Sequence, residues 1–199
     1  MAGTLPLASA RLLIVPGLRN SSPLHWQSWL QSLHSGSVRV NQADWTKPDL
    51  ETWAANITDT LAAAGRGPWL GVAHSFGCLA LARHLALEAD SPLAAALLVA
   101  PADPDAFGLA GLLPQTELAI PTTLVASDTD PWMRVATARL WAQRWGSHWV
   151  NLGDAGHINA EAGFGPLPYA QRWLDAMREP PERAHHFHTA SLAEGPFAV

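Results

Sequence analysis

Short, mostly apolar runs alternate with longer amphipathic stretches along most of this chain. The short runs are typical of buried strands and the longer stretches of helices that cover a sheet. The predicted strands lie near residues 11–15, 37–40, 69–73, 94–99, 122–127 and 147–152, and the predicted helices near residues 24–33, 50–64, 76–88, 132–145 and 169–177. Strands that alternate with helices in this way predict a parallel sheet with right-handed crossovers and helices on both faces.

One domain accounts for nearly all of the chain. Its 199 residues are enough for a complete hydrophobic core, and a composition of 48% hydrophobic and 15% charged residues is typical of a globular protein. We find no internal repeat and no linker that divides the sequence. We therefore expect one α/β domain over residues 1–178 and a C-terminal tail over residues 179–199.

Composition also disfavours several kinds of partner. The net charge of −5, without any run of Lys or Arg, argues against nucleic acid. No stretch approaches the ~18 apolar residues of a membrane span, and residues 1–10 lack the basic start of a signal peptide. We expect a cytoplasmic protein that does not bind membranes. The single cysteine, Cys78, excludes an internal disulfide.

The most informative stretch follows the third predicted strand and reads Ala73-His74-Ser75-Phe76-Gly77. A serine with small residues two positions before and after it, between a strand and a helix, is typical of the nucleophile elbow of α/β-hydrolases. The usual form is G-x-S-x-G, and alanine stands here at the first position. We predict that Ser75 is the nucleophile. The fold is then a minimal α/β-hydrolase, with six mostly parallel strands in the order 2-1-3-4-5-6.

A catalytic serine needs a base and a carboxylate, which follow it along the chain in the order acid, then histidine. Asp128 and Asp130 follow the fifth predicted strand, and His157 lies in a glycine-bearing loop after the last one. We predict His157 as the base and Asp130 as the acid. Asp128 stays an alternative, since either aspartate could instead cap the next helix. Asp154 is expected to shape the histidine loop.

Two backbone amides are needed to stabilise the oxyanion of the reaction. One is expected from Phe76, directly after the nucleophile. The other is expected from Leu18, because Gly17 allows a sharp turn after the first strand. The helix that follows this loop is predicted to be capped by Ser21 or Ser22.

The predicted substrate pocket is small and apolar, which suits a short acyl or aryl group. Residues 101–121 form the longest non-periodic insert, and its Phe107 is placed over the pocket, with a plain surface crossover as the alternative. Trp132 is expected near the pocket because it closely follows Asp130. His25, on the first helix, is expected to steady the oxyanion loop beside the substrate.

The remaining histidines are not expected to carry chemistry. His74 is interpreted as a packing or loop-anchoring residue, and His34, His84 and His148 as ordinary surface or edge positions. The cluster His185-His186-Phe187-His188 lacks carboxylate or cysteine partners at ligand spacing, so no metal site is predicted there.

Two segments resemble a known family of small serine hydrolases, which includes the retinoblastoma-binding-protein-9-like and YdeN-like hydrolases. Gly17, Ser21, His25-Trp26 and Trp29 resemble its G-x-x-x-S-x-x-x-H-W-x-x-W opening, and residues 156–165 resemble its C-terminal catalytic loop. The resemblance spans about residues 11–177. It implies an α/β-hydrolase without a large lid, a Ser75–His157–Asp130 triad and hydrolysis of small esters or similar acyl compounds.

These observations predict an enzyme that cleaves small carboxylic esters through an acyl-enzyme intermediate, without cofactor or metal. The same triad also serves thioesterases, lactonases, amidases and perhydrolases, which stay open as alternatives. A further alternative is a non-catalytic binding protein that keeps the fold, because a fold alone does not establish activity.

Overall fold

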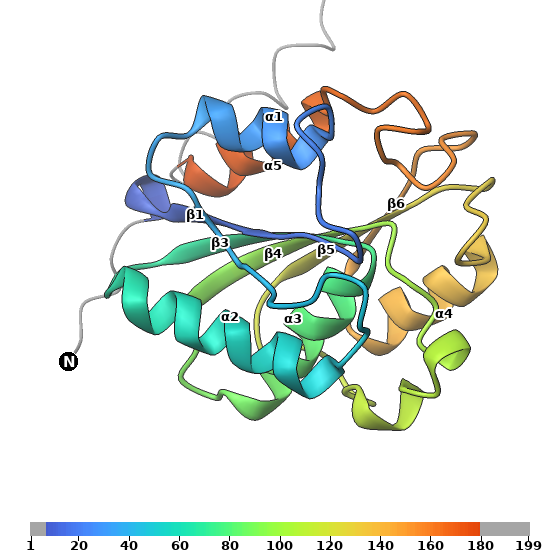
Figure 1. Ribbon diagram of the computed structural model, residues 1–199, viewed down its shortest axis with the longest axis horizontal. Coiled ribbons are helices and arrows are strands. Elements are labelled where there is room, and N and C mark those ends of the chain that lie inside the picture. Colours follow the sequence, from blue (N-terminus) through green and yellow to red (C-terminus); the bar gives the residue numbers. More distant parts are fainter. Residues whose placement is uncertain (1–6, 180–199) are drawn as a thin grey trace, which may run out of the picture.

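The computed structural model describes residues 7–179, and its centre is a six-stranded parallel sheet (Figure 1). The strand order is β2-β1-β3-β4-β5-β6, as the sequence predicts. The strands are β1 (Arg11–Val15), β2 (Val38–Arg39), β3 (Trp69–His74), β4 (Leu93–Val99), β5 (Thr122–Ala126) and β6 (His148–Asn151). All six residues of β3 are buried, as is expected for a strand covered on both faces.

Helices cover both faces of the sheet. Figure 1 shows α1 and α5 on one face and α2, α3 and α4 on the other. The helices are α1 (Trp26–Leu33), α2 (Leu50–Ala64), α3 (Phe76–Leu87), α4 (Val135–Arg144) and α5 (Pro168–Arg178). Alternate residues of β1 divide between the two cores, because successive side chains of a strand point to opposite faces. Leu13 packs with the α2–α3 side, whereas Leu12 packs with the α1–α5 side.

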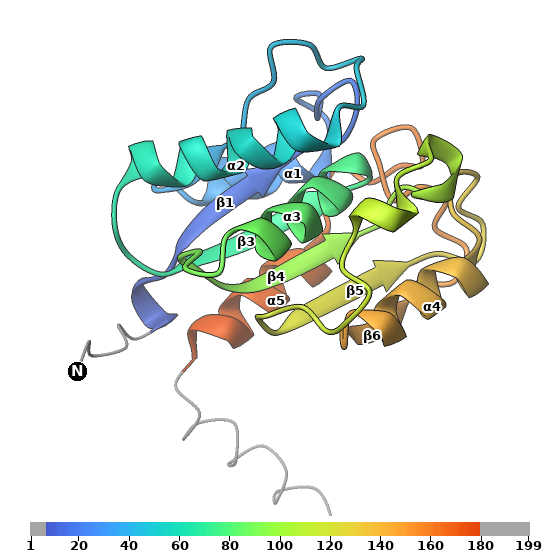
Figure 2. The same cartoon turned by 90° about the horizontal axis from the view of Figure 1, so that it is seen from below.

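The insert between β4 and β5 forms two short 3-10 turns, η2 (Asp105–Phe107) and η3 (Ala110–Leu112). It lies beside α3 and α4 (Figure 2). Arg83 of α3 donates a hydrogen bond to the Leu112 carbonyl, and the indole of Trp145 donates to the Pro114 carbonyl. These bonds tie the insert to the later part of α3 and to the C-terminal end of α4, whereas its Phe107 reaches Phe76 beside Ser75.

Two helices begin later than the sequence predicts. Helix α1 begins at Trp26, and its cap is His25 rather than Ser21 or Ser22, because the His25 Nδ1 accepts a hydrogen bond from the Gln27 amide. Helix α4 begins at Val135 rather than at Trp132. The Asp130 carboxylate accepts a hydrogen bond from the Trp132 amide, and this bond belongs to a turn before the helix.

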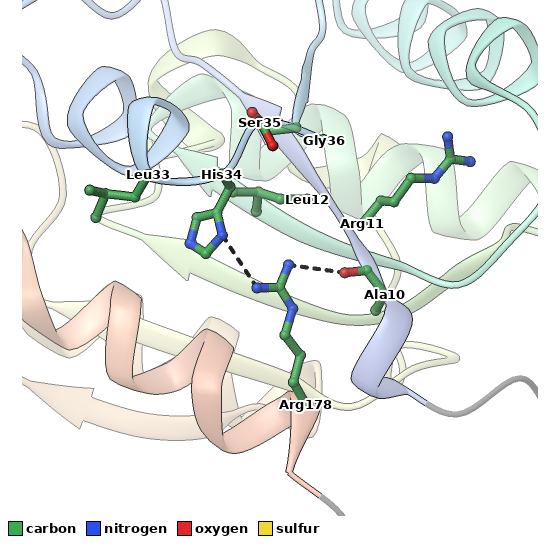
Figure 3. A pocket seen from close by; sticks show the side chains of 9 residues that line it. Ala10, Arg11, Leu12, Leu33, His34, Ser35, Gly36 and Arg178 are labelled. Atoms are coloured by element: carbon green, nitrogen blue, oxygen red, sulfur yellow. Dashed lines mark hydrogen bonds between the residues drawn. The ribbon is translucent and has the colours of Figure 1, made fainter.

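Arg178, the last residue of α5, ties this helix to the amino edge of the sheet. Its guanidinium donates to the Ala10 carbonyl and to Nδ1 of His34 (Figure 3). A hollow of about 240 Å³ lies beside these groups. It is at the amino ends of the strands and therefore opposite the edge that carries Ser75. Within residues 7–179, no helix is long and apolar enough to cross a membrane.

Candidate active site

Ser75 occupies a strained turn between β3 and α3. Its backbone angles are φ 55° and ψ −124°, a conformation that residues other than glycine rarely adopt. Gly77 is required because a Cβ atom there would collide with the carbonyl oxygens of Val15 and Pro16. A Cβ on Gly17 would lie 2.7 Å from the Cβ of Ser75, so the loop after β1 also approaches the serine without a side chain.

His157 lies between Ser75 and Asp130. Its Nε2 is 3.0 Å from the Ser75 Oγ, and its Nδ1 is 2.9 Å and 3.0 Å from the two carboxylate oxygens of Asp130. A carboxylate can only accept, so Nδ1 carries the proton and Nε2 can accept the serine hydroxyl. The side chains of His157 and Asp130 are 10% and 3% exposed. The arrangement can therefore take a proton from Ser75.

The three nearby aspartates have different partners. Asp130 is the one whose carboxylate contacts the His157 ring. Asp128 accepts a hydrogen bond from the Asn151 side chain at 2.8 Å, and Asp154 accepts one from the Thr129 hydroxyl, also at 2.8 Å. Asp128 and Asp154 thus join the loops to each other, whereas Asp130 is the aspartate hydrogen-bonded to the imidazole.

Hydroxyl groups join the aspartate loop to the histidine loop, a feature that the sequence analysis missed. The Ser127 Oγ donates to the Gly153 carbonyl and accepts from the Ala155 amide. The Thr129 Oγ1 accepts from the Gly156 amide at 3.0 Å. A small hydroxyl residue at the end of a buried strand, with a second one two positions later, is the signal that could have indicated this link.

The predicted oxyanion donors belong to two segments that meet at Ser75. Phe76 is the first residue of α3, where a helix leaves its amides without intrahelical acceptors. Leu18 follows Gly17 directly, and the next two residues, Arg19 and Asn20, have left-handed backbones with φ of 66° and 62°. This loop therefore turns sharply beside Ser75.

Arg39 of β2 holds this loop in place, and the sequence analysis also missed this role. Its guanidinium donates to the Asn20 side chain at 3.0 Å and to the Ser21 carbonyl at 3.2 Å. It also donates to the side chains of Ser28 and Gln31 on α1. Burial lowers the pKa of the guanidinium, but arginine stays charged at any physiological pH.

Comparison with known proteins identifies the family of this chain. The family model described as serine hydrolase matches residues 12–176. The chain belongs to this serine hydrolase family. A structure described as a YdeN-like hydrolase from Pectobacterium atrosepticum is 36% identical, with a TM-score of 0.80, over 86% of this chain and 92% of its own. No curated protein sequence matches significantly.

More distant structures show the fold alone. The YdeN gene product of B. subtilis has a TM-score of 0.69 at 23% identity, over 85% of this chain and 98% of its own. Esterase RhEst1 from Rhodococcus sp. has a TM-score of 0.62 at 16% identity, over 87% of this chain and 93% of its own. The predicted α/β-hydrolase fold and the resemblance to YdeN-like hydrolases are confirmed, and the chain is a serine hydrolase.

Two further histidines of this serine hydrolase are buried behind His157. His74 donates a hydrogen bond from Nε2 to the His157 carbonyl at 3.0 Å, and its ring centroid lies 4.8 Å from the rings of both His157 and His25. Burial, followed by the nearby His157 and His25, lowers the pKa of His74 well below its usual range. Burial, followed by the charge of Arg39, lowers the pKa of His25 to about 4.

The three residues predicted to bind substrate lie in different surroundings. His25 is 5% exposed and packs on His74, which favours a supporting role over substrate contact. Phe107 packs edge-to-face on Phe76 at 5.3 Å and so covers one side of the elbow. Trp132 is 67% exposed and follows the Asp130 turn.

The prediction that His84 is an ordinary surface or edge residue was wrong. His84 is 2% exposed, and its two ring nitrogens lie 3.0 Å from the Thr58 hydroxyl and 2.8 Å from the Ser91 hydroxyl. Two hydroxyl partners, one of them on the neighbouring helix α2, allow this histidine to be buried where α2 and α3 pack together. The histidine cluster of residues 185–188 lies outside the described residues.

Proposed function

We propose that this serine hydrolase cleaves small carboxylic esters, with Ser75 as nucleophile, His157 as general base and Asp130 as the orienting acid. The observation that carries the proposal is the position of the His157 ring. One of its nitrogens lies 3.0 Å from the serine hydroxyl, and the other lies 2.9 Å from a buried carboxylate. This arrangement is the one that makes an otherwise weak serine hydroxyl nucleophilic.

In the first half of the reaction, the Ser75 Oγ attacks the ester carbonyl while its proton moves to Nε2 of His157. The negative charge that develops on the carbonyl oxygen is stabilised by the backbone amides of Phe76 and Leu18. The protonated imidazole keeps its Nδ1–H bond to Asp130 and gives the Nε2 proton to the leaving alcohol. The products of this half are the alcohol and an acyl-Ser75 ester.

In the second half, water repeats the sequence of proton transfers. His157 takes a proton from a water molecule, and the resulting hydroxide attacks the acyl carbonyl. The tetrahedral intermediate then collapses, and Nε2 returns the proton to the Ser75 Oγ. The free acid leaves, and each step balances without a cofactor or metal.

Short acyl groups fit the surroundings of Ser75 better than long chains. Residues 101–121 form an insert on this edge, and its turns η2 and η3 each span three residues. Phe107 packs against Phe76, so it fills space at the elbow. We expect a shallow acyl site formed by apolar side chains, with the exposed Trp132 at its rim.

A fluorophosphonate probe tests this assignment together with a panel of p-nitrophenyl esters. Ser75→Ala removes the nucleophile and is expected to abolish labelling and to lower kcat by up to about 10⁶-fold, while the protein stays folded. Ser32→Ala is a matched control, because this serine lies on α1 and only donates to the Trp29 carbonyl. Labelling at another serine, or unchanged turnover of Ser75→Ala, would disprove the proposal.

A further inference from the structure

Two ring N–H groups hold consecutive carbonyls of the loop that carries His157. The His74 Nε2 donates to the His157 carbonyl at 3.0 Å, and the Trp26 Nε1 donates to the Ile158 carbonyl at 2.8 Å. His74 ends β3 and Trp26 begins α1, so the two donors come from separate elements. Trp26 is completely buried and His74 is 5% exposed. The backbone of the histidine loop is therefore held by hydrogen bonds to two of its carbonyls, those of His157 and Ile158.

The loop adopts a conformation that needs such support. Ile158 has φ 47°, a left-handed value that is unfavourable for a β-branched residue. Such a backbone persists only where the surroundings determine it. The Trp26 amide also donates to the Phe164 carbonyl at 3.0 Å, so Trp26 holds the loop at two positions six residues apart.

His74 suits this position because it remains a neutral donor. Its acceptor is a backbone carbonyl, so the proton must lie on Nε2. Its ring packs 4.8 Å from the His157 ring, which becomes positively charged during each turnover. A second positive charge at that distance would oppose proton transfer from Ser75. Burial disfavours a charge on His74, and its lowered pKa agrees with this.

We infer that His74 is a positioning residue for catalysis, whose Nε2–H bond to the His157 carbonyl, together with the Trp26 bond to the Ile158 carbonyl, sets the imidazole at its working distance from Ser75. The inference rests on the proposed role of His157 as general base. It assigns no contact between His74 and the substrate. Removing the bond is expected to impair the chemical step and to leave substrate binding unchanged.

Two substitutions separate the N–H donor of His74 from its ring. His74→Phe keeps a flat ring but has no donor, whereas His74→Gln keeps an amide N–H at similar reach. We expect His74→Phe to lower kcat on p-nitrophenyl acetate by about 10- to 100-fold, because displacement of a catalytic group by about 1 Å costs up to about 100-fold. KM should stay the same, the rate of fluorophosphonate labelling should fall in parallel, and His74→Gln should recover most of the loss.

His84→Phe is the matched control for a general loss of stability. His84 is also buried and hydrogen-bonded through its ring, but it lies near the end of α3 that is far from Ser75. His84→Phe should lower the thermal midpoint and leave kcat unchanged. If His74→Phe does not fold, Trp26→Phe removes the second donor while keeping an aromatic ring, and it should show the same loss of kcat at constant KM.

Three results would overturn the inference. The first is a kcat of His74→Phe within about twofold of the parent. The second is a His74→Gln enzyme as impaired as His74→Phe. The third applies if His74→Phe does not fold, and it is a folded Trp26→Phe enzyme with the parental kcat. Ser75→Ala distinguishes this failure from failure of the proposed function. If Ser75→Ala is inactive and His74→Phe is fully active, the Ser75 mechanism stands and only the role of His74 is wrong.

Discussion

Replacing Asp130 by asparagine gives a sharp test of the proposed acid, because the change keeps the shape of the side chain and removes its charge. The Asp130 carboxylate accepts hydrogen bonds from both the His157 ring and the Trp132 amide. In Asp130→Asn, the single remaining oxygen is expected to keep the place of Oδ1, which accepts from the Trp132 amide, so that the new NH₂ group takes the place of Oδ2, the carboxylate oxygen 2.9 Å from Nδ1 of His157. The new NH₂ group then faces Nδ1 of His157 and donates to it. That bond moves the imidazole proton to Nε2.

The tautomer change determines the size of the effect. With the proton on Nε2, His157 can no longer accept the hydroxyl proton of Ser75, although the two atoms remain about 3.0 Å apart. A triad left intact in geometry but held in the wrong tautomer loses about 10⁴-fold in kcat. This loss equals about 5.4 kcal/mol of transition-state stabilisation. Overall stability should change much less, because the side chain keeps its volume and its bond to the Trp132 amide.

Asp128→Asn is the matched control, since Asp128 bonds to the Asn151 side chain and not to the histidine. The assay is kcat and KM on p-nitrophenyl acetate for both variants, with the thermal midpoint measured for each. We expect a loss of about 10⁴-fold for Asp130→Asn and a change within about threefold for Asp128→Asn. An Asp130→Asn enzyme with more than a tenth of the parental kcat would refute the reasoning. So would an Asp128→Asn enzyme that loses more kcat than Asp130→Asn.

Two other properties can be measured directly. Specificity constants on p-nitrophenyl esters should peak between acetate and butyrate, because a shallow site cannot bury further methylenes at ~0.8 kcal/mol each; a profile still rising at dodecanoate would contradict this. Stability should fall as the pH drops from 6.5 towards 4, because burial lowers the pKa of His84 from 6.5 to about 4 and the unfolded chain then binds the proton more tightly. His84 contributes at most about 3 kcal/mol to this fall. In His84→Gln, the free energy of unfolding by urea should therefore depend less steeply on pH. An equally steep dependence would exclude His84 as a cause.

The four inner strands β1, β3, β4 and β5 could be predicted from the sequence because they are buried on both faces and read as apolar runs. The order of the strands followed from the nucleophile elbow, which places β3 at the centre of a known fold. Helix starts were less predictable. At α1 a histidine serves as the cap, although serines stand nearby, since its Nδ1 is held next to the Gln27 amide. That choice depends on packing between His25 and His74, which no local pattern reveals.

The residues that surround Ser75 could be predicted because each follows a different strand of a parallel sheet. The carboxyl ends of such strands meet at one edge, so loops far apart in sequence converge there. The supporting groups could not be predicted in the same way. Arg39 and Ser127 act through backbone carbonyls and amides of other loops, and such contacts leave no characteristic spacing in the sequence.

Backbone strain in this serine hydrolase is concentrated at the same edge as the site. Among residues 7–179, the non-glycine residues with left-handed φ are Arg19, Asn20, Ser75, Ala100 and Ile158. Each lies in a segment that follows a strand on the carboxyl side of the sheet, and each such conformation costs on the order of 1–3 kcal/mol.

Hydrogen bonds from neighbouring elements oppose this strain. The Ser75 amide donates to the Val99 carbonyl, and the Ala100 amide donates to the Val125 carbonyl, so each strained turn is tied to the next strand. Arg39 holds the Asn20 side chain, and Trp26 holds the Ile158 carbonyl. Because every strained turn depends on a different neighbour, the geometry of the site is a property of the whole sheet edge. Loosening one of these bonds should therefore impair activity before it unfolds the protein.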